Sequence, residues 1–252
     1  MRTTKTLAMA VAVAVAMAFG GYDSLGAKDT DDRIVSSAKK SYVYRTYLKD
    51  DDIKIEAKDG VVTLSGAVAE ESHKSLAEDT VKGLPGVKSV DNRLTVKAQP
   101  PAPMSDDWIS AKVKAALLFH RSTSGKTQVF VKDGVVTLKG AASSKAQKDL
   151  STEYARDVEG VKDVINEMTI VSTAPPEPTL GEKIDDASIT AQVKMTLMTH
   201  RSTSALRTEV ETKDGVVTLS GKARNQAEKD LATKLAKDID GVTDVKNTMT
   251  TE

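Results

Sequence analysis

The sequence predicts an α/β protein of the α+β kind, built from three tandem αββαβ modules, each with two helices packed on a three-stranded mixed sheet. Two recurring segments carry this prediction. The first is KDGVVTLSG, which starts at Lys58 and recurs 74 residues later, with one substitution, and again after a further 81 residues. The second has the form G-V-x-x-V-x-N, starts at Gly86 and recurs at the same two offsets. Because both segments recur together, the whole unit is repeated.

Two proline-rich stretches, AQPPAPMS and STAPPEPTLGE, separate the repeats and hold six of the seven prolines. Such stretches favour extended, semi-rigid spacers. The modules are therefore placed at 31–98, 105–172 and 184–252, with linkers at 99–104 and 173–183. We call them modules 1, 2 and 3, and the linkers predict that they fold independently.

Apolar residues spaced four apart predict a helix at the start of modules 2 and 3. They are Ile109, Val113 and Leu117 in module 2 and Ile189, Val193 and Leu197 in module 3. Module 1 departs from this pattern, and we expect a helix over 36–47 that carries Tyr42, Tyr44 and Tyr47. These tyrosines could form a partner-facing or lipid-facing surface, and the alternative is half-buried packing.

A β-hairpin is expected next in each module, because an Asp-Gly pair lies between two β-branched segments. Such a pair favours a type I′ turn, which needs positive φ at both central residues. The turn residues are Asp59, Gly60, Asp133, Gly134, Asp214 and Gly215. Phosphate-binding loops are the alternative for these glycines, but the order of strand, glycine-rich loop and helix that such loops need is missing.

A second helix and a last strand complete each module. In module 3 the apolar face of this helix holds Ala227, Leu231, Leu235 and Ile239. Asn225 and Glu228 form its capping pair, and the last strand is expected from Val242 to about Thr250. Two helices on one face of the sheet would bury both apolar stripes.

The N-terminus has the anatomy of a secretory signal peptide. Arg2 and Lys5 precede an uncharged run from Leu7 to Phe19, which contains the small-residue pattern Ala16-Met17-Ala18. This run is shorter than the roughly 20 residues of a membrane span. We expect a cleaved signal peptide at 1–18, a periplasmic location and no transmembrane span in the mature chain; an uncleaved anchor is the alternative.

Composition argues against several classes of function. Lys+Arg and Asp+Glu both number 36, so the overall charge gives no sign of nucleic-acid binding. The absence of cysteine excludes disulfides, thiolate metal sites and a lipidated N-terminal cysteine. The three histidines, His73, His120 and His200, lie in different modules without a partner at metal-ligand spacing, and the last two are expected at helix C-termini. We expect no catalytic, metal or cofactor site, and therefore no enzyme.

The two recurring motifs, D-G-x-V-x-L-x-G and G-V-x-x-V-x-N, lie one helix apart in each module. Together with the first-helix stretch from Trp108 to Leu118, they resemble the BON family (bacterial OsmY and nodulation) over essentially the whole mature chain. The resemblance implies an αββαβ module of exported envelope proteins that are tied to osmotic stress and outer-membrane integrity. Some of these proteins bind anionic phospholipid, and most carry two modules rather than three.

Trp108 is the only tryptophan, and Lys112 and Lys114 follow it on the predicted helix. An aromatic ring beside lysines suits an anionic bilayer surface, and the alternative is that Trp108 covers the edge of the core. We expect these three residues to bind anionic phospholipid in a non-enzymatic protein that supports the envelope under osmotic or other stress. The alternative partners are envelope proteins, which the chain would bind as an interaction or chaperone module.

Overall fold

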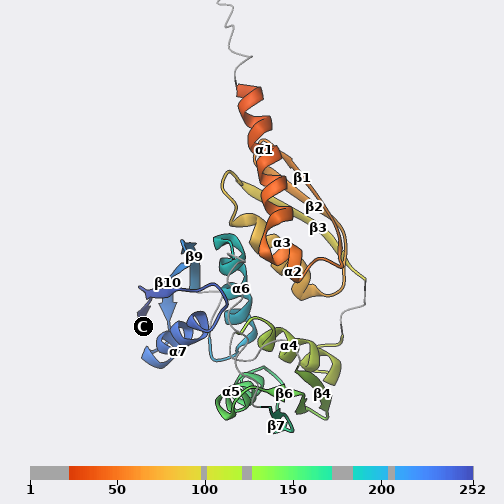
Figure 1. Ribbon diagram of the computed structural model, residues 1–252, viewed down its shortest axis with the longest axis vertical. Coiled ribbons are helices and arrows are strands. Elements are labelled where there is room, and N and C mark those ends of the chain that lie inside the picture. Colours follow the sequence, from red (N-terminus) through yellow and green to blue (C-terminus); the bar gives the residue numbers. More distant parts are fainter. Residues whose placement is uncertain (1–22, 98–100, 121–126, 172–183, 204–207, 252) are drawn as a thin grey trace, which may run out of the picture.

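The computed structural model describes residues 23–97, 101–120, 127–171, 184–203 and 208–251. The expected signal peptide at 1–18 and the linker at 173–183 lie outside these residues. Within them the chain is of the α+β class, with three repeats of helices and strands on small mixed sheets, as the recurring segments predict (Figure 1).

Module 1 has an uninterrupted three-stranded sheet. Its elements are α1 Asp23–Lys40, α2 Tyr42–Thr46, β1 Asp52–Lys58, β2 Val61–Val68, α3 Glu71–Lys82 and β3 Ser89–Val96. The strand order is β1-β2-β3, with β1 antiparallel and β3 parallel to β2. A parallel neighbour needs a crossover connection, and α3 provides it. The expected single helix over 36–47 is wrong: Ser41 separates α1 from α2, because its hydroxyl accepts from the Tyr44 N–H and caps the second helix.

Modules 2 and 3 repeat this plan with a divided last strand. Module 2 contains α4 Asp106–Leu118, β4 Gln128–Lys132, β5 Val135–Lys139, β6 Ala141–Ala142, α5 Lys145–Arg156, β7 Asp163–Asn166 and β8 Thr169–Ile170. Module 3 contains α6 Asp186–Thr199, β9 Thr208–Lys213, β10 Val216–Ala223, α7 Gln226–Lys237, β11 Asp244–Asn247 and β12 Thr250–Thr251. The last strand of module 3, expected in one piece, is thus divided into β11 and β12, and both pair with β10.

An aspartate on each module's first helix holds the hairpin turn: Asp106 and Asp186 begin α4 and α6, whereas Asp31 lies in the middle of α1. In module 2, Asp133 and Gly134 have φ values of 53° and 81°. Their N–H groups donate to the two carboxylate oxygens of Asp106 over 2.7 and 2.9 Å. Asp31 in module 1 and Asp186 in module 3 accept from the corresponding turns in the same way. Each helix is therefore tied to its hairpin.

The apolar helix faces lie where the periodicity predicts, with one exception. Ile109, Val113 and Leu117 are buried, and so are Ile189, Val193 and Leu197. On α7 the expected Ala227 is exposed, whereas Ala232 is buried beside Leu235. Ala227 lies in the first turn of the helix, at the edge of the packed face.

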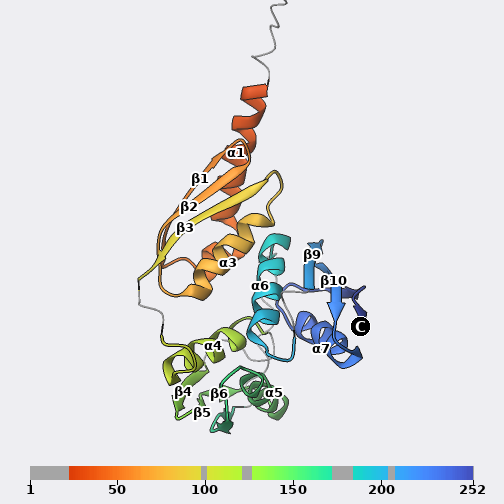
Figure 2. The same ribbon diagram turned by 180° about the vertical axis from the view of Figure 1, so that it is seen from behind.

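The three modules pack against one another rather than standing apart, and the independent folding that the linkers suggest stays a prediction. Modules 1 and 3 share one hydrophobic cluster, and α6 lies between α3 and α7 (Figure 2). Gly83 allows the close approach, since a Cβ there would lie 3.1 Å from the Ala187 Cβ of α6. The buried side of α6 even includes polar residues such as Gln192 and Thr196.

Candidate binding site at the module junction

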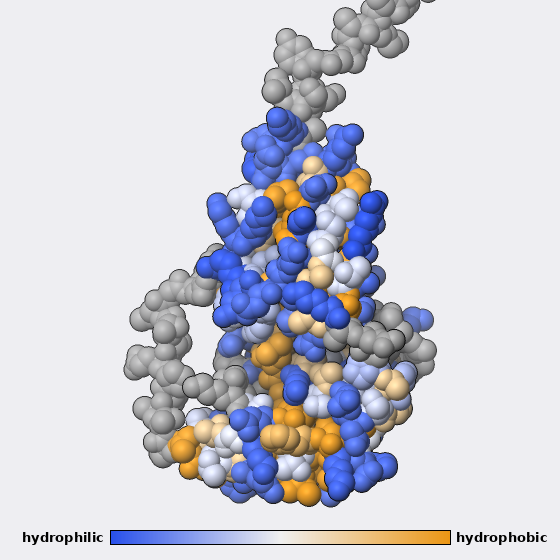
Figure 3. Space-filling view, turned by 90° about the vertical axis from the view of Figure 1, so that its right-hand side faces the viewer, coloured by the Kyte–Doolittle hydropathy of each residue, from blue (hydrophilic) through white to orange (hydrophobic). Residues whose placement is uncertain are grey.

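A cavity of about 570 Å³ lies where the three modules meet. Its walls come from the start of α3, the end of β3, the chain at 101–103, one face of α4 and the last turns of α6. Apolar side chains dominate the lining, among them Val96, Pro103, Trp108, Met195 and Met198. Figure 3 shows apolar side chains gathered in the lower half of the molecule, where α4 and the rest of module 2 lie.

Helix α4 presents two adjacent faces to two different surroundings. Ile109 and Val113 are buried in the core of module 2. Trp108 and Lys112, four residues apart and therefore neighbours on the helix surface, line the cavity. The Lys112 ammonium lies 5.4 Å from the centroid of the Trp108 ring, within cation–π range. Ser105 fixes the start of the helix by accepting from the Trp108 N–H at 3.2 Å.

The structure brings two of the three proposed lipid-binding residues together. Trp108 and Lys112 are half-buried at the cavity. Lys114 is exposed and lies outside the cavity lining, because six residues after Trp108 the helix has turned to another face.

The charges around the cavity are few and lie on different elements. Among the described residues that line it, Lys112 is the one cationic side chain, whereas Glu70 and Glu71 stand at the start of α3. His73 contacts Glu70 over 3.5 Å and Asp51 over 2.6 Å, which places Glu70 in a local group of polar contacts within module 1. A ligand with an anionic group and an apolar body would therefore meet its favourable charge on the α4 wall.

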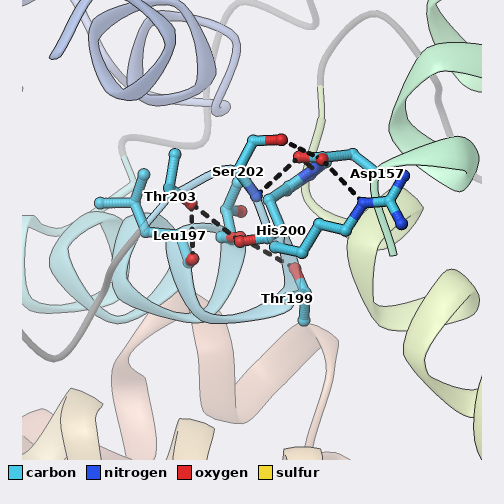
Figure 4. Close-up of polar contacts among 8 residues, drawn as sticks. Asp157, Leu197, Thr199, His200, Ser202 and Thr203 are labelled. Carbon is cyan, nitrogen blue, oxygen red and sulfur yellow. Dashed lines mark hydrogen bonds and ion pairs between the residues drawn. The ribbon is translucent and has the colours of Figure 1, made fainter. Parts of the chain in front are cut away.

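A second junction, between modules 2 and 3, consists of reciprocal histidine–aspartate contacts. His200, at the end of α6, contacts Asp157, which ends α5, over 3.2 Å (Figure 4). His120, two residues after α4, contacts Asp238, which ends α7, over 3.1 Å. Tyr154 donates to the same Asp238 at 2.9 Å and stacks on His120.

The histidines therefore join modules, where the sequence suggested only a role at the end of their own helices. Burial lowers the pKa of His120 despite its contact with Asp238. Burial alone would raise the pKa of Asp157, but hydrogen bonds from His200 and Ser202 hold it below its usual value. The Ser202 hydroxyl donates to Asp157 rather than to a histidine, so this group lacks the serine–base contact of a nucleophilic centre.

The described residues hold neither a candidate metal site nor a candidate membrane span. No group of His, Cys, Asp or Glu within them could hold a metal ion. None of the helices in this part of the chain has the length and hydropathy of a membrane span.

Comparison with known proteins places the repeats in a family. The BON domain matches residues 30–98, 105–172 and 185–252. The chain is 37% identical over 151 residues to "Osmotically-inducible protein Y" of Escherichia coli (strain K12), covering 59% of this chain and 74% of that protein. It is 30% identical over 141 residues to "Outer membrane lipoprotein DolP" of Haemophilus influenzae, covering 55% and 70%. An uncharacterized protein of Anaplasma centrale is 30% identical over 142 residues, covering 56% and 91%.

Proposed function

The chain belongs to the BON domain family, and from that premise we propose that it is a non-catalytic envelope protein that binds anionic phospholipid at the junction of its modules. The observation that carries the proposal is the Trp108–Lys112 pair on the wall of an apolar cavity. A cavity of about 570 Å³ falls within the roughly 300–1,000 Å³ range of small-molecule sites.

The α4 and α6 walls suit an anionic amphiphile, although Glu70 and Glu71 leave the described lining with one net negative charge. Lys112 would attract the phosphate, and a lysine near an anionic surface contributes on the order of 1 kcal/mol. Trp108 suits the headgroup level, where its ring is partly in apolar surroundings and its N–H stays near polar groups. Met195 and Met198 would contact the apolar part, since their flexible side chains fill irregular space.

The relatives support the proposed setting. One is named for the outer membrane and another for osmotic induction. We propose that this chain is exported through its N-terminal signal peptide at 1–18, works in the periplasm and supports the envelope under osmotic or other stress.

Co-sedimentation with vesicles tests the binding proposal. The mature protein should sediment with vesicles of phosphatidylglycerol and phosphatidylethanolamine, and much less with phosphatidylcholine alone. Trp108→Ala and Lys112→Gln should weaken this binding. Lys114→Gln removes the same charge from the same helix but outside the cavity, so it is the matched control. Equal weakening by Lys112→Gln and Lys114→Gln would contradict the cavity as the site.

A protein client is the second candidate, because Met198 is 54% exposed beside the cavity and methionine adapts to varied apolar partners. In that case the cavity would hold an apolar segment of an exported protein. Binding of an unfolded exported protein that Trp108→Ala abolishes, with no sedimentation on any vesicle, would favour this alternative.

A further inference from the structure

The outer face of the module 2 sheet, opposite its helices, carries two large exposed apolar side chains in one cross-strand row. Phe130 on β4, Thr137 on β5 and Ile165 on β7 are cross-strand neighbours. Phe130 is 54% exposed and Ile165 is 48% exposed. Both large side chains therefore stand on the solvent side of a three-stranded sheet.

The same row is charged in the other two modules, as their strand registers show. It consists of Glu56, Thr63 and Asp91 in module 1 and of Glu211, Thr218 and Lys246 in module 3. The fold therefore does not require apolar residues at the two outer positions. Only module 2 has large apolar residues, Phe130 and Ile165, at these two positions. This indicates an interaction surface, because large exposed apolar groups often mark interaction sites.

The adjacent row of this face adds opposite charges at its two edges. Lys132 on β4 and Asp163 on β7 flank Val135 on β5, and both charged side chains are exposed. Lys139, also on this face, is paired with Glu167 over 3.1 Å. One row is therefore basic at the β4 edge and acidic at the β7 edge, and the next row carries Phe130 and Ile165 on either side of Thr137.

We propose that this face pairs with the same face of a second copy of the chain, about a two-fold axis parallel to the strands. Such an axis exchanges the two edge strands, so Phe130 would face Ile165 of the second copy. Lys132 would face Asp163 of the second copy, and each residue of the central strand would meet its own equivalent. Lys139 would therefore meet Lys139, with each held by Glu167 of its own copy. The two edge strands complement each other as a closed two-fold dimer requires, and face-to-face packing of aligned sheets is a common arrangement.

The size of the face sets the strength of the pairing. Strands of four or five residues in three rows cover on the order of 250 Å² at the usual strand spacings. Stable complexes bury about 800 Å² on each partner. The dimer is therefore weak and depends on protein concentration. Because α4 covers the opposite side of the sheet, formation of the dimer leaves the cavity at the module junction open.

Sedimentation equilibrium of the mature protein over a wide concentration range tests the pairing. We expect a reversible monomer–dimer equilibrium that Phe130→Glu weakens at least about tenfold, since an isolated charge would face Ile165. Both sister modules carry glutamate at this position, so the variant should keep its fold. Ile165→Lys, the residue of module 3, provides a second variant with the same expected effect.

A charge exchange tests the axis itself. Lys132→Asp and Asp163→Lys should each weaken the dimer, and the double variant should restore it because opposite charges again face each other. A monomer at every concentration, or a dimer that Phe130→Glu and Ile165→Lys leave unchanged, would overturn the proposal, and failed restoration would overturn the two-fold arrangement. Vesicle binding should persist in Phe130→Glu, which separates this proposal from the one on lipid.

Discussion

Asp185 holds the beginnings of two helices in two modules, so its replacement by alanine tests how the modules are joined. One of its carboxylate oxygens accepts from the Ser188 N–H at 2.9 Å and caps α6. The other accepts from the Tyr42 N–H of module 1 at 2.8 Å. Ser188 extends this link, since its hydroxyl accepts from the Val43 N–H at 3.1 Å.

The expected cost follows from these bonds. Loss of a helix N-cap destabilises by about 1 kcal/mol, and the half-buried Tyr42 N–H left without its acceptor adds at most the roughly 1–3 kcal/mol of a buried group. Asp185→Ala should therefore lower the free energy of unfolding by more than the loss of a cap alone and by at most about 4 kcal/mol. Ser105→Ala is the control, because Ser105 caps α4 through the Trp108 N–H within its own module, and about 1 kcal/mol is expected for it.

Urea unfolding gives the two free energies, and amide exchange locates the damage. In Asp185→Ala the protection of the Tyr42 and Val43 amides should fall together with that of the first turn of α6. A cost no larger than that of Ser105→Ala, or unchanged protection at Tyr42 and Val43, would refute the claim that one carboxylate joins the modules.

Three further outcomes are expected. Gly134→Val should destabilise module 2 by at least about 1 kcal/mol, since Gly134 has φ 81° and a Cβ there would lie 3.2 Å from the Gly160 carbonyl oxygen; amide exchange would show the loss centred on β4 and β5. Stability should fall as the pH drops below about 6.5, because the buried His120 has a lowered pKa and the unfolded chain then binds more protons. Urea unfolding near pH 7 and near pH 5 should show a smaller fall in the free energy of unfolding for His120→Gln than for the unchanged protein. An equal fall in both would show that His120 does not cause the pH dependence. Mass spectrometry of the periplasmic protein should find residues 1–18 removed, and an intact Met1 would contradict the signal peptide.

The periodic parts of the fold could be predicted from the sequence because each is a local pattern. Apolar residues four apart marked the buried faces of α4 and α6, and the Asp-Gly pairs stand at the turns between paired strands. The break at Ser41 was missed, because a serine within a helical pattern is ambiguous until its hydroxyl is seen to cap a new helix.

The packing of the modules depends on residues outside the periodic pattern. Gln192 and Thr196 of α6 are buried although polar residues at those positions would usually face solvent. A signal was present, since Lys194 is the one charged residue between Ile189 and Thr199. A helix with so little charge is typical of one that is covered on most sides.

The candidate site was foreseen in part. Helical spacing brings Trp108 and Lys112 together and turns Lys114 away, which the residues alone could have shown. The cavity could not be foreseen, because its walls come from three modules whose relative positions no local pattern records. The reciprocal contacts of His120 and His200 could not be foreseen either, because they too join different modules. The sequence showed only that the two histidines occupy equivalent places in their repeats.

The single tryptophan of the chain makes the central claim directly measurable. Trp108 is half-buried at the cavity, so its fluorescence reports on anything that enters there. Titration with phosphatidylglycerol vesicles should shift the emission to shorter wavelength, phosphatidylcholine vesicles should not, and Lys112→Gln, unlike Lys114→Gln, should require more lipid for the same shift. An emission spectrum that stays unchanged while the protein sediments with anionic vesicles would show that the lipid binds elsewhere.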